Sequence, residues 1–419
     1  MDKKTKGARL IHHTKKLQNF TNQAEFENTF YAGKAGILLS SISADNQIIL
    51  NRERVEVLAK ASNITKLELP TLLKYLEAKG LIDSSEDEIS VLGVTTSSAL
   101  SHTADIFDSF APESLELAAL DVAELTSIKP VRQREISEEI SDIYRLDKST
   151  TAQLISASTS FGFVDVEYFG KDDRLLFNGN LFRRETASKV EKILSSLSDK
   201  ESQRLIEASN ILAETACVPL EQIKNILGEE LFNKVSAIGI LDINVVSNSS
   251  EDSGFVTLPS AFAKFGDSMV SDAFDLAKAF ISSITYGMTK SPYERGQIQM
   301  VSVLLKALIR GEPVGPVKAI GEDYKILELK GVIEVKNDWK KGRYGPMMKL
   351  LKREVGELVL QLIEQGDISE YSLDILPGVA VTEFNGPEYN RESVRRQQIA
   401  TNPKATNDML SILRQGGFS

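Results

Sequence analysis

The sequence has few of the residues that most often carry chemistry. It contains one cysteine, Cys217, and three histidines, His12, His13 and His102. A single cysteine excludes a disulfide within the chain, and its apolar neighbours predict a buried, inert thiol. None of the histidines has sequence neighbours that would complete a catalytic or metal site, and there is neither a glycine-rich phosphate loop nor a serine nucleophile motif. We therefore expect a protein that is not an enzyme and that binds no cofactor or metal.

Long hydrophobic runs are also missing. No apolar stretch approaches the roughly 20 residues that a membrane-spanning helix needs. The lysine-rich N-terminus has no hydrophobic segment behind it, as a secretory signal would. Apolar residues make up 42% of the chain and charged residues 26%, which is typical of globular proteins. These features predict a cytoplasmic protein with no membrane contact.

What the sequence does have is a repeat. Four helix-like stretches end at a glycine that is followed by two apolar residues and an acid, namely at Gly80, Gly162, Gly239 and Gly331. The glycines are spaced at about the length of a small domain. Each is interpreted as a left-handed residue that ends a helix. A β-type run, a polar turn and a second apolar run follow each glycine, which predicts a hairpin.

Upstream of each hairpin the apolar residues recur at the spacing of an amphipathic helix. Two short helices separated by a polar corner lead to each glycine, and a longer amphipathic helix and a short strand precede them. In the third copy, for example, we expect a strand at 216–218 and helices at 220–227 and 229–238. The order helix, strand, helix, helix, strand, strand over residues 30–365 resembles the winged-helix variant of the helix-turn-helix domain. The resemblance implies a mainly α, α+β protein of four tandem winged-helix domains joined by helical linkers.

The repeat divides the chain into six parts. Residues 1–20 are expected to form a basic arm that is flexible or partly helical. Four repeat units follow, the third of which includes a helical linker: 21–110, 111–198, 199–288 and 289–366. Residues 367–419 are richer in Pro, Gly and Asn, and we interpret them as a tail that docks a protein partner.

Charge is distributed unevenly along the chain. The net charge is −10, which argues against nucleic acid coating the whole surface. Residues 1–20 nevertheless have a local charge of +5, and residues 336–353 have +6. The second segment coincides with the fourth hairpin and interleaves cations with aromatic residues. On a wing, this pattern favours phosphate contact with insertion or stacking in a groove. The alternative is a solvated basic hairpin whose aromatic rings pack on their own domain. The residues assigned to this nucleic-acid site are Lys336, Trp339, Lys340, Lys341, Arg343, Tyr344 and Lys349.

The second helix of each pair is the other candidate contact. The winged-helix resemblance implies that this helix enters the major groove. The second unit fits best, because its helix begins with side chains that can bind base edges or phosphates. These are Lys148, Ser149, Thr150 and Gln153. The third unit presents Glu229 and Glu230 instead, which favours a structural or protein-binding copy. The segment 108–147 has a local charge of −6 and predicts a basic protein partner.

Three functions are consistent with these observations. The favoured one is a non-catalytic protein, a regulator or recognition subunit, that binds double-stranded DNA. The alternative is a winged-helix scaffold or adaptor subunit of a multi-protein DNA-processing or defence complex. The third is a metal-dependent nuclease, because Asp323, Glu334 and Lys336 resemble the acid and the Glu-x-Lys strand of restriction-endonuclease-like nucleases. Glu334 is equally explained by the repeat, and Asp323 is expected near the start of a helix instead of on a strand.

Overall fold

A computed structural model gives the fold of most of the chain. It describes residues 1–20, 23–45, 47, 49–85, 88–169, 173–247, 252–265, 271–291 and 296–367. These residues form a mainly helical α+β protein with small antiparallel sheets, which confirms the expected fold class at that level. From residue 368 onward the predicted tail lies outside the described residues, so its docking role stays a prediction.

The first unit follows the expected element order. Its elements are α2 (Glu27–Ser43), β1 (Ile49–Asn51), α3 (Arg52–Ala61), α4 (Leu69–Ala78), β2 (Ile82–Ser84) and β3 (Glu88–Val91). The three strands form an antiparallel sheet in the order β1-β3-β2, so the last strand is central. Leu38, Leu72 and Leu76 are fully buried between the helices and this sheet. The helix α5 (Thr96–Ser109) then leads to the second unit.

The second and third units repeat this order. The second contains α6 (Ser114–Ile128), β4 (Val131–Arg132), α7 (Gln133–Tyr144), α8 (Lys148–Ser160), β5 (Asp165–Phe169) and β6 (Asp173–Phe177). The third contains α10 (Asp199–Thr215), β7 (Val218–Pro219), α11 (Leu220–Leu227), α12 (Glu229–Ala237), β8 (Asp242–Ser247) and β9 (Asp252–Thr257). Their sheets have the orders β4-β6-β5 and β7-β9-β8. The glycines that mark the repeat have φ between +64° and +76°, which confirms the predicted left-handed helix ends.

The fourth unit departs from the pattern at its first strand. Its elements are α16 (Val301–Ile309), α17 (Lys318–Asp323), α18 (Lys325–Leu329), β10 (Ile333–Lys340) and β11 (Arg343–Leu350). The strand expected at 312–314 is reduced to one bridge, in which Val314 and Met348 exchange two backbone hydrogen bonds of 2.8 Å. Pro313 and Pro316 lie near this bridge and lack the N–H groups that would extend a ladder.

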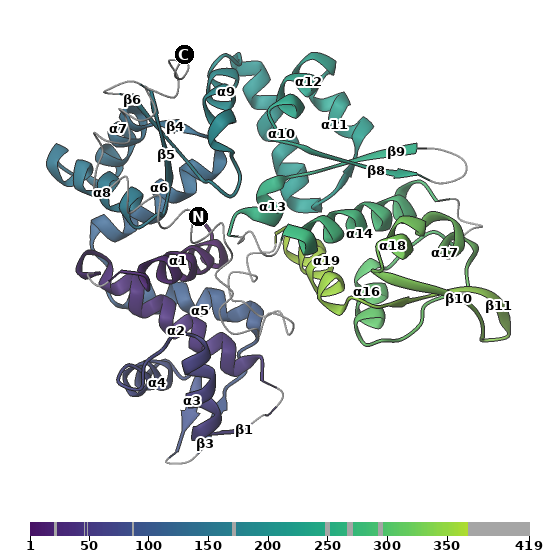
Figure 1. Cartoon of the computed structure of the whole chain (residues 1–419), viewed down its shortest axis with the longest axis horizontal. Coiled ribbons are helices and arrows are strands. Elements are labelled where there is room, and N and C mark those ends of the chain that lie inside the picture. Colours follow the sequence, from purple (N-terminus) through teal and green to yellow (C-terminus); the bar gives the residue numbers. More distant parts are fainter. Residues whose placement is uncertain are drawn as a thin grey trace, which may run out of the picture. The chain divides into compact units, whose positions relative to one another are not determined.

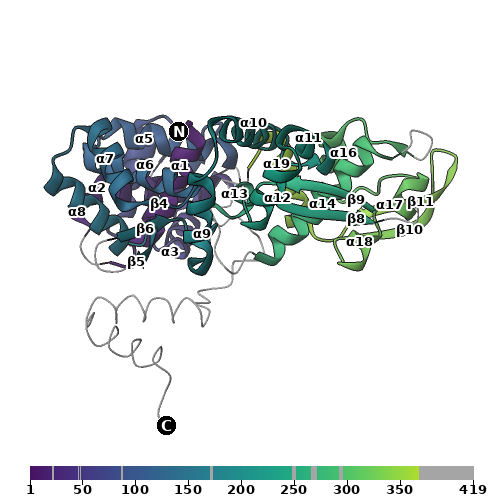
Figure 2. The ribbon, with the colours of Figure 1, turned by 90° about the horizontal axis from the view of Figure 1, so that it is seen from above.

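The fourth hairpin is longer than the sequence indicates. The polar residues 336–342 predict the turn of this hairpin, which is wrong, because β10 continues to Lys340 and the turn consists of Lys341 and Gly342 alone. Both turn residues have positive φ, +51° and +75°. A two-residue turn of this kind matches the twist of the strands and allows polar residues to pair up to the tip. The tip extends past α17 and α18 (Figure 1, Figure 2).

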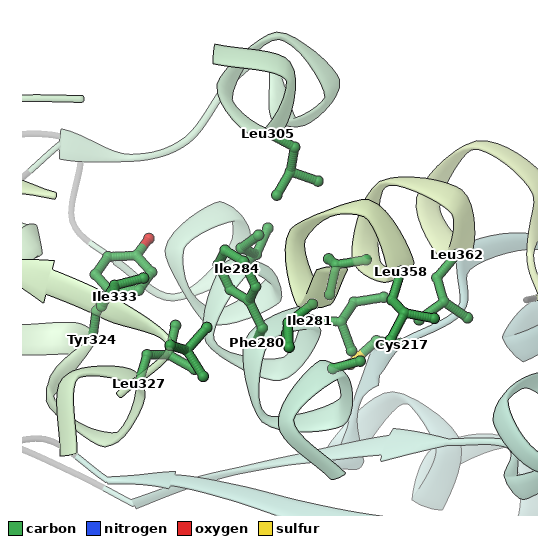
Figure 3. Packing of buried hydrophobic residues seen from close by; sticks show 14 of the residues in the cluster. Cys217, Phe280, Ile281, Ile284, Leu305, Tyr324, Leu327, Ile333, Leu358 and Leu362 are labelled. Atoms are coloured by element: carbon green, nitrogen blue, oxygen red, sulfur yellow. The ribbon is translucent and has the colours of Figure 1, made fainter. Parts of the chain in front are cut away.

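Linking helices bury the faces that the sequence marked as amphipathic. The helical linker expected in the third unit covers residues 261–286, whose amphipathic pattern predicts that it packs the third unit against the fourth. It forms α13 (Pro259–Ala263) and α14 (Ser271–Thr289), and Phe280 and Ile284 of α14 lie in one core with Cys217 and Ile333 (Figure 3). The last helix of the described residues, α19 (Arg353–Gln365), packs against α14 and α16. The third and fourth units therefore share a hydrophobic core. Between the second and third units, α9 (Arg184–Ser195) packs its own core against both.

The N-terminal segment is not a free arm. Residues Lys3–Leu17 form α1, which lies against α2 and α5 (Figure 1). Leu10, Ile11 and Leu17 are fully buried, and a Cβ at Gly7 would lie 1.9 Å from the carbonyl oxygen of Leu100. The expected helical character is present, but the flexibility is not. The apolar residues recur at helical spacing among the lysines, and that spacing decides the packing.

Candidate nucleic-acid interface

The register of the fourth hairpin sorts its side chains onto two faces. Trp339 pairs with Tyr344, and Lys340 pairs with Arg343. Directly paired residues of antiparallel strands project from the same face, and successive residues alternate between faces. The aromatic face carries Trp339 and Tyr344 at the tip and runs into the core at Val335 and Met348. The charged face carries Glu334, Lys336, Asp338, Lys340, Arg343 and Lys349. Cations and aromatic residues therefore alternate in the sequence but lie on opposite faces of the hairpin.

The charged face of the hairpin retains unpaired cations. Together with Lys341 at the turn, it has five cations against two acids. The ammonium of Lys336 lies 2.6 Å from Glu334, and that of Lys340 donates to the carbonyl of Pro313. Lys341, Arg343 and Lys349 are exposed and have no acidic partner among the described residues. This face therefore offers positive charge that the fold does not use.

The aromatic face of the hairpin tip is open to solvent. Trp339 is 68% exposed and Tyr344 is 61% exposed. Their ring centroids are 5.4 Å apart with an angle of 44° between the planes. The rings contact each other and are not covered by their own domain, in contrast to the alternative considered from the sequence.

Helix α8 keeps part of its predicted contact surface. Asp147 caps the helix and accepts hydrogen bonds from the backbone N–H of Thr150 at 2.9 Å and from its hydroxyl at 3.2 Å. These bonds hold the pKa of Asp147 below its usual value. Lys148 and Ser149 are exposed in the first turn, whereas the Gln153 amide donates to Glu25 at 2.6 Å. Thr150 therefore serves the cap, and Lys148 and Ser149 are the accessible candidates.

The acidic segment 108–147 uses several of its carboxylates internally. Glu116 on α6 is buried and accepts from the backbone N–H of Thr29 at 2.8 Å. Asp121 accepts from the hydroxyl of Tyr144 at 2.5 Å. Among the exposed acids, Asp108 pairs with Lys6, Asp147 caps α8 and Glu113 precedes α6. The other four lie on α7: Glu135, Glu138, Glu139 and Asp142. The acidic surface proposed for a basic partner is thus centred on α7 instead of covering the whole segment.

The basic N-terminal helix also uses its charge internally. Arg9 is fully buried, with its guanidinium 2.6 Å from Glu124 and stacked over the ring of Phe265 at 4.8 Å. Lys264 lies 2.5 Å from the same carboxylate. Burial raises the pKa of Glu124, but Lys264 and Arg9 outweigh it, so the pKa lies below its usual value. This three-residue cluster joins α1, α6 and the end of α13.

Two histidines lie on the buried side of the same helix. The ring of His13 stacks on that of Phe163, with centroids 3.8 Å apart and planes 5° from parallel. The next turn places Lys16 where it donates to the carbonyl of Gly162. Burial lowers the pKa of His12 and of His13 well below 6.5, and the neighbouring cations lower both further. Both rings are therefore neutral at pH 7 and act as packing groups.

The residues that resemble a nuclease motif lie in different environments. Asp323 was expected near the start of a helix, which is wrong: it is the last residue of α17, and the next helix, α18, begins only at Lys325. Its carboxylate is buried and accepts from the hydroxyl of Ser291 at 3.1 Å. Glu334 lies on the charged face of the hairpin beside Lys336. Among the residues that the structure describes, no group of three or more His, Cys, Asp or Glu is placed to hold a metal ion.

The remaining candidate group is the thiol of Cys217. It is buried, and its sulfur lies 3.9 Å from the hydroxyl of Ser282. Burial raises the pKa of this thiol to about 11, so it is protonated and unreactive at neutral pH. This agrees with the inert thiol expected from its apolar neighbours.

Sequence reasoning missed two lysines of the fourth unit. Lys325 and Lys330 are exposed on and just after α18, on either side of the buried Leu327. Helix α18 packs against β10, so these cations belong to the same unit as the hairpin. The spacing of these lysines around a buried leucine is a sequence signal for an exposed basic helix face. The helix has only five residues, which is too short for this pattern to be recognised in the sequence.

Comparison with known proteins adds no assignment. No protein-family description matches the chain, and no curated protein is significantly similar to it. None of the helices in the described ranges is long and apolar enough to span a bilayer. The site must therefore be interpreted from its own geometry and charge.

Proposed function

We propose that this protein is a non-catalytic double-stranded DNA-binding protein built of four tandem winged-helix units. The single observation that carries the proposal is the fourth hairpin, whose five cations oppose two acids on a projecting strand pair. Three of these cations, Lys341, Arg343 and Lys349, have no acidic partner among the described residues, and cations held on paired backbone suit phosphate contact. The recurrent element order and the sheets with a central last strand support the winged-helix resemblance.

Helix α8 supplies the second contact in this proposal. Lys148 and Ser149 are exposed at its first turn, where the macrodipole and the free N–H groups favour a phosphate or a base edge. Binding of a base by Gln153 requires its hydrogen bond to Glu25 to be exchanged for one to DNA. The phosphate contacts of the hairpin would provide most of the affinity, and α8 would provide the base contact.

A scaffold function is the second candidate, and the third unit favours it. Helix α12 begins with Glu229 and Glu230, which form ion pairs with Lys224 at 3.6 Å and with Lys234 at 2.9 Å. This surface repels phosphate. The shared core of the third and fourth units also fixes them as one body, as a scaffold subunit requires. In this candidate function the acidic face of α7 or α12 binds a basic protein.

The test is DNA binding across a salt series, measured by fluorescence anisotropy of labelled duplex. In the test variant, Lys336, Lys340, Lys341 and Arg343 are changed to Ala. Loss of four phosphate contacts should flatten the slope of log affinity against log salt by about 3 to 4. The matched control removes four exposed cations of α9 and α10, which changes the net charge equally: Lys189, Lys192, Lys200 and Arg204.

Three outcomes separate the candidate functions. A slope that changes in the hairpin variant and not in the control supports DNA binding by the fourth unit. Absence of binding by the unaltered protein near physiological salt contradicts DNA binding and favours the scaffold. Equal slopes in both variants would place any DNA contact away from the hairpin.

A further inference from the structure

The tip of the fourth hairpin holds an aromatic pair in a fixed position. Trp339 and Tyr344 form the second-last paired position before the turn, and the last, Lys340 with Arg343, closes the hairpin beyond them. The turn has only two residues, so both rings are carried by paired backbone to within one residue of the tip. A ligand that binds these rings meets a preorganised surface, and little ordering entropy is lost.

These rings are unusually exposed for this protein. They are the two most exposed aromatic side chains among the described residues, and Tyr168, the next, is 54% exposed. The rest of their face is apolar only at its base, where Val335 and Met348 pack into the core. Aromatic rings that remain exposed bury little apolar area and so add little to the stability of the fold. This exposure is typical of a binding surface.

The two faces of the hairpin define the chemistry of the ligand. One face offers flat apolar rings, and the opposite face offers Lys341, Arg343 and Lys349 without acidic partners among the described residues. A ligand that contacts both faces carries a planar ring and an anion that reaches around the hairpin tip, where Lys341 and Arg343 lie. Nucleotides have this combination, with a base that stacks on aromatic side chains and a phosphate that binds cations.

A base inside a continuous duplex cannot use the aromatic face, because both of its ring faces are stacked on neighbouring bases. Unpaired bases present a free ring face. We propose that Trp339 and Tyr344 stack on an unpaired base where a duplex meets a single strand, while the cations of the charged face hold the flanking phosphates. This rests on the proposed nucleic-acid binding and makes its ligand class narrower: a duplex with a single-stranded junction.

The chain contains a built-in reporter for this contact, because Trp339 is its only tryptophan. Tryptophan emission is recorded while the protein is titrated with two DNAs of one sequence. The first is a relaxed, covalently closed circular duplex, and the second is a linear duplex with single-stranded overhangs. Stacking on a base should quench the emission with the overhang DNA and leave it nearly unchanged with the closed circle. The overhang should also bind about tenfold more tightly, because tenfold corresponds to about 1.4 kcal/mol and lies within the range for one stacked base.

Variants separate stacking from phosphate binding. The double change Trp339→Ala and Tyr344→Ala should abolish the tenfold preference for the overhang, measured as the ratio of the affinities for the two DNAs. The change Trp339→Phe keeps a ring and should keep most of the preference, as measured by competition anisotropy. Leu329→Ala, at an exposed apolar residue of α18, is the control and should keep all of it.

The outcomes also distinguish the two proposals. Binding of both DNAs with equal affinity and no quenching overturns the stacking proposal and leaves DNA binding intact. Failure to bind either DNA overturns both. Quenching that persists equally with the closed circle overturns the requirement for an unpaired base and indicates insertion into intact duplex.

Discussion

Residues 1–20 and residues 336–353 are the two basic segments of this acidic chain, and the fold uses their cations differently. In α1, Lys3 and Lys6 pair with Asp105 and Asp108 of α5, and Arg9 is buried against Glu124. In the fourth hairpin, Lys341, Arg343 and Lys349 have no acidic partner among the described residues. The first segment holds the fold together, and the second presents charge outward.

The difference comes from what each element packs against. Helix α1 lies across α5 and α6, whose acids face its cations, so its charge is neutralised within the protein. The hairpin leaves its core after Val335, and the exposed residues around its turn are Lys336 to Trp339 on β10 and Arg343 and Tyr344 on β11. Local charge therefore predicts a nucleic-acid surface only where the element extends beyond its own acids.

The largest effect on stability should follow from removing the carboxylate that pairs with the buried cations. The change Glu124→Gln leaves Arg9 and Lys264 close together without their shared carboxylate. Removing one partner of a buried ion pair costs about 3 kcal/mol or more of unfolding free energy. Urea denaturation of the full chain measures this loss.

Glu138→Gln on α7 is the matched control, because Glu138 forms an exposed ion pair with Arg134 at 3.0 Å. Exposed pairs of this kind contribute at most about 0.5 kcal/mol. A loss below about 1 kcal/mol for Glu124→Gln would show that α1 is not held by its buried charge.

A second effect follows from the buried histidines of α1. The folded pKa values of His12 and His13 are lowered, so the unfolded chain binds protons that the folded protein does not. Their contribution to stability is complete above about pH 6.5 and is lost as the pH falls below it, at up to about 1.4 kcal/mol per pH unit for each histidine.

Replacement of His13 by Phe should reduce this dependence, since a phenyl ring can stack on Phe163 and does not titrate. Denaturation midpoints between pH 7 and pH 5 measure it. His102→Asn on α5 is the control for loss of a half-buried histidine. If His13→Phe leaves the pH dependence of the unfolding free energy between pH 6.5 and pH 5 unchanged, protonation of His13 does not cause the loss of stability at low pH.

The repeat was predictable because it depends on local signals. A glycine that needs positive φ ends each second helix, and the following apolar residues pair as strands, so Gly80 and its three counterparts located the hairpins. The pairing of the α1 cations was not predictable, because their acidic partners lie about 100 residues away in sequence, in α5 and α6. A lysine-rich segment is interpreted as solvent-exposed when the acids that face it in the fold are not known.

The extent of the fourth hairpin was hidden for a related reason. Residues 336–340 lack the alternation of apolar and polar residues that marks a strand. Pairing is imposed by the turn at Lys341 and Gly342, and its left-handed backbone is visible only in the structure. Once the register is known, the separation of Trp339 from the cations follows from the two-residue period of a strand.

The smallest effect compares one cation from each basic segment. Lys3→Gln removes an exposed ion pair with Asp105, and Arg343→Gln removes a charge near the hairpin tip. Each should change the unfolding free energy by less than about 0.5 kcal/mol, because both side chains are exposed. Their effects on DNA should differ. Arg343→Gln should flatten the slope of log affinity against log salt by about 0.9, the value for one phosphate contact, whereas Lys3→Gln should leave it unchanged. A phosphate contact releases a counterion and therefore changes this slope. Equal slopes in the two variants would mean that Arg343 contributes no more to DNA binding than Lys3, which contradicts the comparison.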